Sequence, residues 1–219
     1  MDKNYLENLA NHENGDSNIC FIGNRKKIFL IGDSLRRGYS PFVKEILSSK
    51  YEVVYPNDNC RNTQYVITSL FGWVNMFENP DDVVAVCFNC GHWDIAHWDM
   101  EEECLTPILE YQRNIRRIIK KLKNFFPKAK ILFFTTSPIM PLKMDGHTNP
   151  RTNEEIEKYN QAAVIACQQE NIVIKDMNAF MKDWNADCYL DYAHPTQERS
   201  AILGQYVADA LIEMLEKEI

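Results

Sequence analysis

The chain has 219 residues, which suits one sizeable α/β domain and is short for two, since domains usually span about 100–200 residues. Its 24 Lys and Arg against 31 Asp and Glu give a formal net charge of −7, which disfavours attraction to nucleic acid or to an anionic membrane surface. The hydrophobic residues, 45% of the total, lie in many short runs, and none approaches the ~20 apolar residues that a membrane helix needs. We therefore expect a soluble protein.

The first segment, residues 1–25, is polar and acidic and lacks the basic start, apolar stretch and cleavage site of a secretory signal. We expect a polar N-terminal arm there, followed by a single domain over residues 26–219, in a cytoplasmic protein. The seven cysteines are an odd number, which indicates reduced thiols that pack as small hydrophobic side chains. Cys87 and Cys90 form a C-x-x-C pair, but no second pair at zinc spacing follows, so no metal site is predicted.

After the arm, apolar runs of strand length alternate with longer stretches of helical periodicity. Thr152 and Glu155 form a capping-box pattern before one of these helical stretches. The predicted strands cover residues 28–31, 51–55, 83–88, 131–134 and 172–174. The predicted helices cover residues 41–49, 63–76, 105–126 and 153–169, and a last one runs from about residue 196 to the C-terminus.

Short apolar strands, each separated from the next by a helix, predict a parallel sheet covered on both faces. We expect a flavodoxin-like three-layer α/β/α sandwich whose five strands have the order 2-1-3-4-5. In that order the tip of the first strand lies beside the tip of the third, at the switch point where ligand sites form in open α/β sheets.

The first predicted strand ends in Gly32-Asp33-Ser34, which places a serine at this edge of the sheet. A serine hydroxyl is a weak nucleophile at neutral pH, so it needs an imidazole to take its proton and a carboxylate to orient that imidazole. Asp191 and His194 precede the last helix and can share one loop turn, so they can supply both groups. Neither motif is specific alone, because an Asp-x-x-His pair often arises by chance and a serine in a Gly-Asp-Ser turn can simply cap the following helix.

Taken together and in this order, Ser34, Asp191 and His194 resemble the catalytic residues of the SGNH/GDSL hydrolase family. Residues from about 27 to 215 follow the layout of that family. The resemblance implies a flavodoxin-like sandwich, a serine hydrolase of esters, and neither a metal nor an organic cofactor.

The resemblance also implies an oxyanion hole, which comprises the Ser34 amide, the amide of a glycine after the second strand and an asparagine side chain after the third. The family's Gly-x-Asn-Asp pattern is kept at Asn89 and lost on both sides of it. No glycine follows the second strand, and Cys60 is the residue expected in its place. Arg61 or Asn62 are the alternatives that would point into the site.

Trp93 and Trp98 follow Asn89 closely, so we expect them in the rim above the serine. There they would stack on a sugar ring or line an acyl pocket, while ordinary packing over the sheet edge is the alternative. Trp93 and Arg61 are the predicted substrate-binding residues. His92 and His97 are five residues apart, which is poor spacing for two metal ligands on one helical face.

The predicted function is that of a serine esterase that acts on a small-molecule or carbohydrate ester through an acyl-enzyme. A short acyl group, such as acetyl, is expected by analogy with the family, whose members often deacetylate carbohydrates. The first alternative is an O-acyltransferase, because water and an alcohol attack the same intermediate. The second is a binding protein without turnover. A flavin-binding flavodoxin ranks last, because the first loop lacks the Ser, Thr and Gly amides of a phosphate cradle.

Overall fold

A five-stranded parallel sheet forms the centre of the protein, of which the computed structural model describes residues 25–217. The strand order is β2-β1-β3-β4-β5, and every neighbouring pair is parallel, so the predicted fold and strand order are confirmed. The strands are β1 (Lys27–Ile31), β2 (Glu52–Val54), β3 (Val83–Phe88), β4 (Lys130–Phe134) and β5 (Val173–Lys175).

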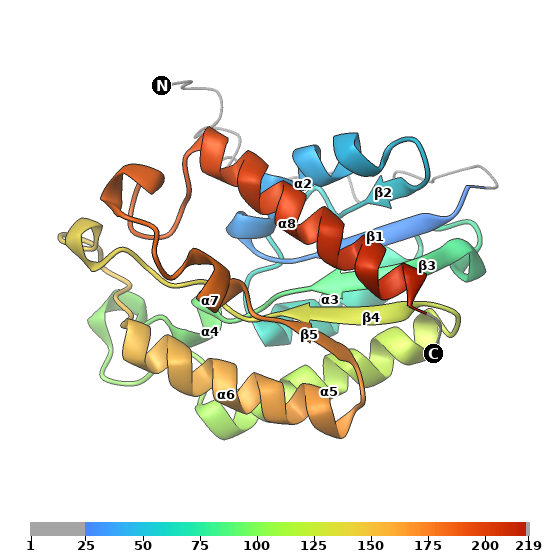
Figure 1. Ribbon diagram of the computed structural model, residues 1–219. Helices are drawn as coiled ribbons and strands as arrows, with labels where there is room; N and C mark the ends of the chain where they lie inside the picture. The colour runs from blue at the N-terminus through green and yellow to red at the C-terminus, as the bar shows by residue number, and fades with distance from the viewer. Residues whose placement is uncertain (1–24, 218–219) are drawn as a thin grey trace.

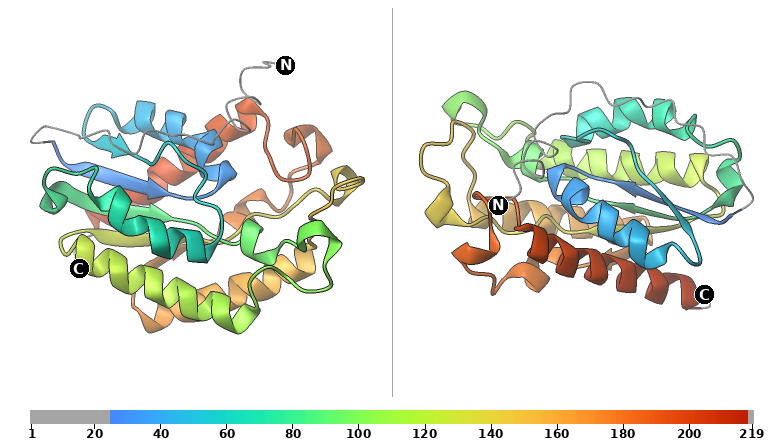
Figure 2. Two further views of the ribbon diagram at one scale, coloured as in Figure 1. Left: turned by 180° about the vertical axis from the view of Figure 1, so that it is seen from behind. Right: turned by 90° about the horizontal axis from the view of Figure 1, so that it is seen from above.

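Helices lie on both faces of this sheet, as Figure 1 shows. In chain order they are α2 (Ser34–Leu47), α3 (Thr63–Val74), α4 (His92–Ile95), α5 (Ile108–Phe125), α6 (Asn153–Gln169), α7 (Met177–Met181) and α8 (Gln197–Glu216). The view from above in Figure 2 shows α2 and α8, blue and red, on one side of the sheet, and α3 and α5, teal and yellow-green, on the other.

Strand β1 shows why both faces are covered. All five of its residues are buried, and successive side chains point to opposite faces. Phe29 and Ile31 pack in one apolar cluster with residues of α3, α5 and α6. Ile28 and Leu30 pack in a second cluster with residues of α2 and α8. The continuous apolar run of β1 therefore supplies both cores, as expected for a strand inside a parallel α/β sheet.

One helix differs from its prediction. The sequence predicts the first helix over residues 41–49. The structure starts α2 at Ser34, where the Asp33 side chain accepts a hydrogen bond from the Leu35 amide, and Pro41 lies exposed inside the helix. Burial of Leu35 and Tyr39 in the α2 and α8 core accompanies this earlier start. The consequence is that the predicted nucleophile is the first residue of a helix.

The remaining boundaries lie close to their predicted positions. Helix α6 covers the predicted residues, and its capping box is present between Thr152 and Glu155. The predicted arm over residues 1–25 lies outside the described residues except for Arg25. Over the described range 25–217, no helix combines the length and apolar character needed to cross a bilayer.

Candidate active site

Ser34 stands at the carboxyl end of β1, on the sheet edge toward which the β1 arrow points in Figure 1. The Asp33 side chain caps α2 by accepting from the Leu35 amide at 3.0 Å. As the first residue of the helix, Ser34 has an N–H without an acceptor inside the helix. Gly32 is required here because a Cβ at this position would lie 2.1 Å from Asn89 Oδ1. Asn89 thus packs against the Gly32-Asp33 segment that directly precedes the serine.

The structure brings Ser34, His194 and Asp191 together. His194 Nε2 lies 2.7 Å from Ser34 Oγ, and His194 Nδ1 lies 2.7 Å from Asp191 Oδ2. The other carboxylate oxygen of Asp191 accepts from the backbone amides of Ala193 and His194, both at 2.8 Å. Burial raises the pKa of Asp191, but these hydrogen bonds and the charge of His194 outweigh burial and lower this pKa to about 2. An ionised carboxylate therefore faces the imidazole at neutral pH.

The loop that carries His194 is closed by its own backbone. Leu190 N–H donates to the His194 carbonyl oxygen at 2.7 Å, next to an antiparallel bridge between Tyr189 and Pro195. Met140 N–H, after β4, donates to the Tyr192 carbonyl oxygen at 2.7 Å. These bonds fix the imidazole over the sheet edge before α8 begins.

Two further groups concern the predicted oxyanion hole. Asn89 is 2% exposed, and its Nδ2 donates to Asp33 Oδ1 at 3.3 Å, which leaves a second N–H on the same nitrogen. Cys60 is fully buried, and its amide donates to the Gly32 carbonyl oxygen at 3.1 Å. The amide hydrogen of Cys60 is therefore already in use, and we leave Cys60 out of the oxyanion hole.

A pocket of about 290 Å³ opens beside the serine. The two indoles line one part of it, with the Trp93 and Trp98 ring centroids 5.0 Å apart. Arg61 does not line the pocket as predicted. Its guanidinium carbon lies 4.8 Å from the Tyr65 ring centroid and 6.0 Å from that of Trp93, so Arg61 contacts the aromatic wall instead.

Several lining residues escaped the sequence analysis. Asn149 and Arg151 come from the loop after β4, and no motif in that loop signals that it folds over the serine. Tyr192 lies inside the Asp-x-x-His motif, and its position next to Asp191 is the signal from which its place in the pocket follows. The full lining comprises Ser34, Leu35, Asn59, His92, Trp93, Trp98, Asn149, Arg151, Tyr192, Ala193 and His194.

Asp94 holds the segment that carries Trp93. It is fully buried, and its carboxylate accepts from the Thr63 hydroxyl at 2.6 Å and from the Thr63 amide. The Thr106 amide donates to the Asp94 carbonyl oxygen at 3.0 Å. These bonds join α4 to the start of α3. Burial raises the pKa of Asp94 to about 6, although the hydrogen bonds from Thr63 oppose this.

The raised pKa of Asp94 predicts a pH-dependent stability. A folded-state value of about 6, above the ordinary 3.8, means that the contribution of Asp94 to stability is largest below pH 3.8 and is lost as pH rises through about 6. When the pH falls from 7 to 5, the free energy of unfolding of the wild type should therefore increase by about 1 kcal/mol relative to that of Asp94→Asn. Thermal unfolding of both proteins at the two pH values measures this difference. Asp145→Asn, at an exposed position, is the control, and an Asp94→Asn difference that does not change with pH would contradict the assignment.

One group of potential metal ligands occurs among residues 25–217, namely His97, Cys104 and Glu155. His97 Nε2 bonds Glu155 Oε1 at 2.7 Å, and His97 Nδ1 lies 3.0 Å from the Glu101 carbonyl oxygen. The other Glu155 oxygen accepts from the Thr152 amide at 2.8 Å. Because these hydrogen bonds account for the grouping, we assign no metal to it.

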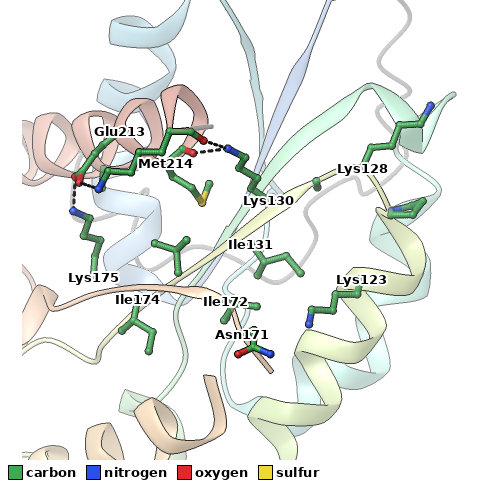
Figure 3. A pocket seen from close by; sticks show the side chains of 15 residues that line it. Lys123, Lys128, Lys130, Ile131, Asn171, Ile172, Ile174, Lys175, Glu213 and Met214 are labelled. Atoms are coloured by element: carbon green, nitrogen blue, oxygen red, sulfur yellow. Dashed lines mark hydrogen bonds and ion pairs between the residues drawn. The ribbon is translucent and has the colours of Figure 1, made fainter. Parts of the chain in front are cut away.

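A second pocket lies at the opposite end of the sheet, at the amino ends of β4 and β5, with a volume of about 720 Å³. Figure 3 shows lysines around an apolar floor that includes Ile131 and Ile174. Lys130 Nζ donates to the carbonyl oxygens of Met214 and Lys217, at 2.9 and 2.6 Å. This pocket contains none of the residues around Ser34, so we do not connect it with the chemistry.

Comparisons with known proteins show the family and the fold of the chain. The sequence profile of the GDSL-like lipase/acylhydrolase family matches residues 15–201. A GDSL esterase/lipase of Arabidopsis thaliana is 27% identical over 213 residues, which cover 86% of this chain and 87% of that protein. A lipase/acylhydrolase of Enterococcus faecalis has a TM-score of 0.69 and 15% identity, and the match covers 89% of this chain and 99% of that one. An acetyl xylan esterase, AlAXEase, has a TM-score of 0.67 and 18% identity, and the match covers 84% of this chain and 99% of that one.

Proposed function

The chain belongs to the GDSL-like lipase/acylhydrolase family and is a serine esterase, and we propose that it hydrolyses esters of short acyl groups at Ser34. The observation that carries this proposal is the continuous set of hydrogen bonds from Ser34 through His194 to Asp191, each side-chain contact being 2.7 Å long. This geometry is what a hydroxyl nucleophile needs at neutral pH.

In the proposed reaction, Ser34 Oγ attacks the ester carbonyl carbon while His194 Nε2 takes the hydroxyl proton. Asp191 holds the imidazole with Nδ1 protonated, so that Nε2 carries the lone pair. Collapse of the tetrahedral intermediate breaks the bond to the alcohol, which receives the proton from His194. Water then attacks the acyl-enzyme in the same way, and the carboxylic acid leaves while Ser34 regains its proton.

The negative charge on the tetrahedral intermediate needs donors that are already in place. We propose the Ser34 amide and the Asn89 Nδ2 group, because the first lacks an intrahelical acceptor and the second has an N–H left over from its bond to Asp33. Each such donor is worth about 3–4 kcal/mol in the transition state. With the Cys60 amide bonded to Gly32, a two-donor oxyanion hole is the arrangement that this chain supports.

The pocket size favours a small substrate. Its volume of about 290 Å³ lies just below the roughly 300–1,000 Å³ of typical ligand pockets, and two indoles line it. The similarity to an acetyl xylan esterase supports acetyl as the acyl group and a carbohydrate as the alcohol, since Trp93 offers a ring face for a sugar. An acyltransferase would use the same residues. The side chains of His194 and Asp191 are 23% and 34% exposed, which admits water and favours hydrolysis.

Chain-length preference tests this proposal. For p-nitrophenyl acetate, butyrate and octanoate, we expect kcat/KM to fall with each step, because a pocket at the small end of the ligand range has no room for a long alkyl chain. A small fluorophosphonate should block the activity and add its mass to the peptide that contains Ser34. Faster hydrolysis of the octanoate would overturn the short-acyl assignment, and labelling of another residue would overturn the nucleophile.

A further inference from the structure

Arg151 places a positive charge in the wall of the pocket beside Ser34. Its side chain comes from the loop after β4, and the residue is 7% exposed. The guanidinium donates to the carbonyl oxygen of His92 and, at 3.2 Å each, to the carbonyl oxygen of Asn149 and the hydroxyl of Tyr192. Its Nε is buried without a partner. All the acceptors around this cation are therefore uncharged, and one donor has none.

Two other buried cations of residues 25–217, Lys27 and Arg36, differ from Arg151 in their surroundings. Lys27, 1% exposed, has the carboxylates of Glu52 and Asp82 within 3.8 and 3.5 Å. Arg36, also 1% exposed, has uncharged acceptors as Arg151 does, namely the backbone carbonyl oxygens of Gly32 and Asp58, but its Nε is hydrogen-bonded and it lines no part of the pocket. Arg151 is the one Lys or Arg in the lining of the pocket, and it forms no salt bridge within residues 25–217.

Two carboxyl groups lie near Arg151, but neither neutralises it. Asp191 is already bonded to His194 at 2.7 Å. Asp33 is buried, which raises its pKa, and its Oδ2 has no hydrogen-bond partner. Both interact with Arg151 at long range, yet burial remains the stronger influence and lowers the pKa of the guanidinium. A buried charge without a close counter-ion is unfavourable, so an anion that enters the pocket removes a penalty present in the free enzyme.

Only one unit of positive charge is available there. His92 also lines the pocket and has an unpartnered Nδ1, but burial, followed by the charge of Arg151, lowers the pKa of His92 well below its ordinary value. A neutral imidazole adds a hydrogen-bonding group and no charge. Asn59 and Asn149 are uncharged as well. The pocket therefore matches a single negative charge better than the double charge of a phosphate monoester.

We propose that the substrate is an ester that also carries one carboxylate, and that Arg151 binds this carboxylate while Ser34 attacks the ester. The proposal rests on the esterase function above and narrows it to carboxylate-bearing substrates. A guanidinium suits this task because its planar N–H groups match the oxygens of a carboxylate.

Pairs of esters that differ only in charge test the proposal. Acetoxyacetate and acetoxyacetamide place the carboxylate or its uncharged isostere on the alcohol side. Monomethyl succinate and methyl succinamate place it on the acyl side. After normalisation to alkaline hydrolysis, the wild type should prefer the carboxylate of at least one pair by about 10-fold or more in kcat/KM. Equal rates within both pairs would overturn the proposal.

Substitutions show whether Arg151 causes this preference. In Arg151→Gln the carboxylate-to-amide ratio should fall to 1 or below, whereas Arg151→Lys should keep part of it because the charge remains. Arg116→Gln removes an equal charge from α5, where Arg116 pairs with Glu170 outside the pocket, and the ratio should not change. A purely structural role of Arg151 would lower both rates of a pair and leave their ratio intact, which would contradict the proposal.

Binding to Ser34→Ala separates this inference from the proposed function. Calorimetric titration of that variant with acetoxyacetate, monomethyl succinate and their amides needs no turnover, and at least one carboxylate should bind about 10-fold more tightly than its amide. Equal binding within both pairs overturns the inference even if Ser34 is the esterase nucleophile. If the wild type hydrolyses no ester but a carboxylate still binds more tightly than its amide, Arg151 would remain a carboxylate-binding residue and the proposed function would be overturned. Tighter binding of 2-acetoxyethyl phosphate would overturn the assignment to a carboxylate.

Discussion

Replacing Ser34 by alanine is expected to lower kcat for p-nitrophenyl acetate by about 10⁴- to 10⁶-fold, the largest effect predicted for any single substitution in this chain. The substitution removes the oxygen that lies 2.7 Å from His194 Nε2, and no acyl-enzyme can form without it. The backbone amide at position 34 and Asn89 remain, so we expect a weak residual activity in which water attacks the ester directly.

Ser48→Ala is the matched control for this experiment. Ser48 caps the other end of the same helix, where its hydroxyl donates to the Glu45 carbonyl oxygen at 2.7 Å. Both variants should unfold near the wild-type temperature, and only Ser34→Ala should lose turnover. Equal hydrolysis by the wild type and Ser34→Ala would assign the reaction to surface groups such as thiols, and the chain would then be better described as a binding protein.

Asp191→Asn is expected to lower kcat by about 10³- to 10⁴-fold with little change in KM. The asparagine oxygen can still accept from the amides of Ala193 and His194, which hold the turn at 2.8 Å. Its NH₂ group then faces His194 Nδ1 as a donor, so the neutral imidazole carries its proton on Nε2. That tautomer cannot accept the proton of Ser34.

Asp187→Asn provides the matched control, since Asp187 is exposed and lies four residues before Asp191. A loss of activity confined to Asp191→Asn would show that orientation of His194 matters rather than local charge. An Asp191→Asn enzyme with more than a tenth of the wild-type kcat would contradict the role given to this carboxylate. Since the pKa of Asp191 is lowered from 3.8 to about 2, its contribution to stability is present above pH 3.8 and is lost as pH falls toward 2. The wild type should therefore lose more stability than Asp191→Asn over that range.

The limits of the sequence are visible at α2. The helical periodicity predicts the first helix over residues 41–49, seven residues after Ser34. The actual start depends on the Asp33 cap and accompanies the burial of Leu35 and Tyr39 in the core that α2 shares with α8. That core is formed with residues more than 150 positions away in the sequence, so the local sequence pattern around residue 34 does not indicate where the helix begins.

The oxyanion hole shows a second limit. The resemblance to the family predicts that Cys60 replaces a glycine and that its backbone amide donates to the substrate. Its amide bonds the Gly32 carbonyl oxygen instead, and that contact exists only because β1 and the segment after β2 lie side by side. A residue type at one position does not determine where its amide points.

The sequence by itself determined the strands and the motifs at Ser34, Asp191 and His194, because buried strands have a continuous apolar pattern and these side chains have distinctive chemistry. The strand order was predicted from the flavodoxin-like fold that the alternation of strands and helices indicates. The sequence also determined the family to which the chain belongs. Only the tertiary structure decided which loops close over the serine, and so placed Arg151 and Asn149 in the pocket. Strand identity follows from local hydrophobicity, whereas the pocket depends on contacts between segments distant in the chain, and the charge that we expect to select the substrate comes from one of those segments.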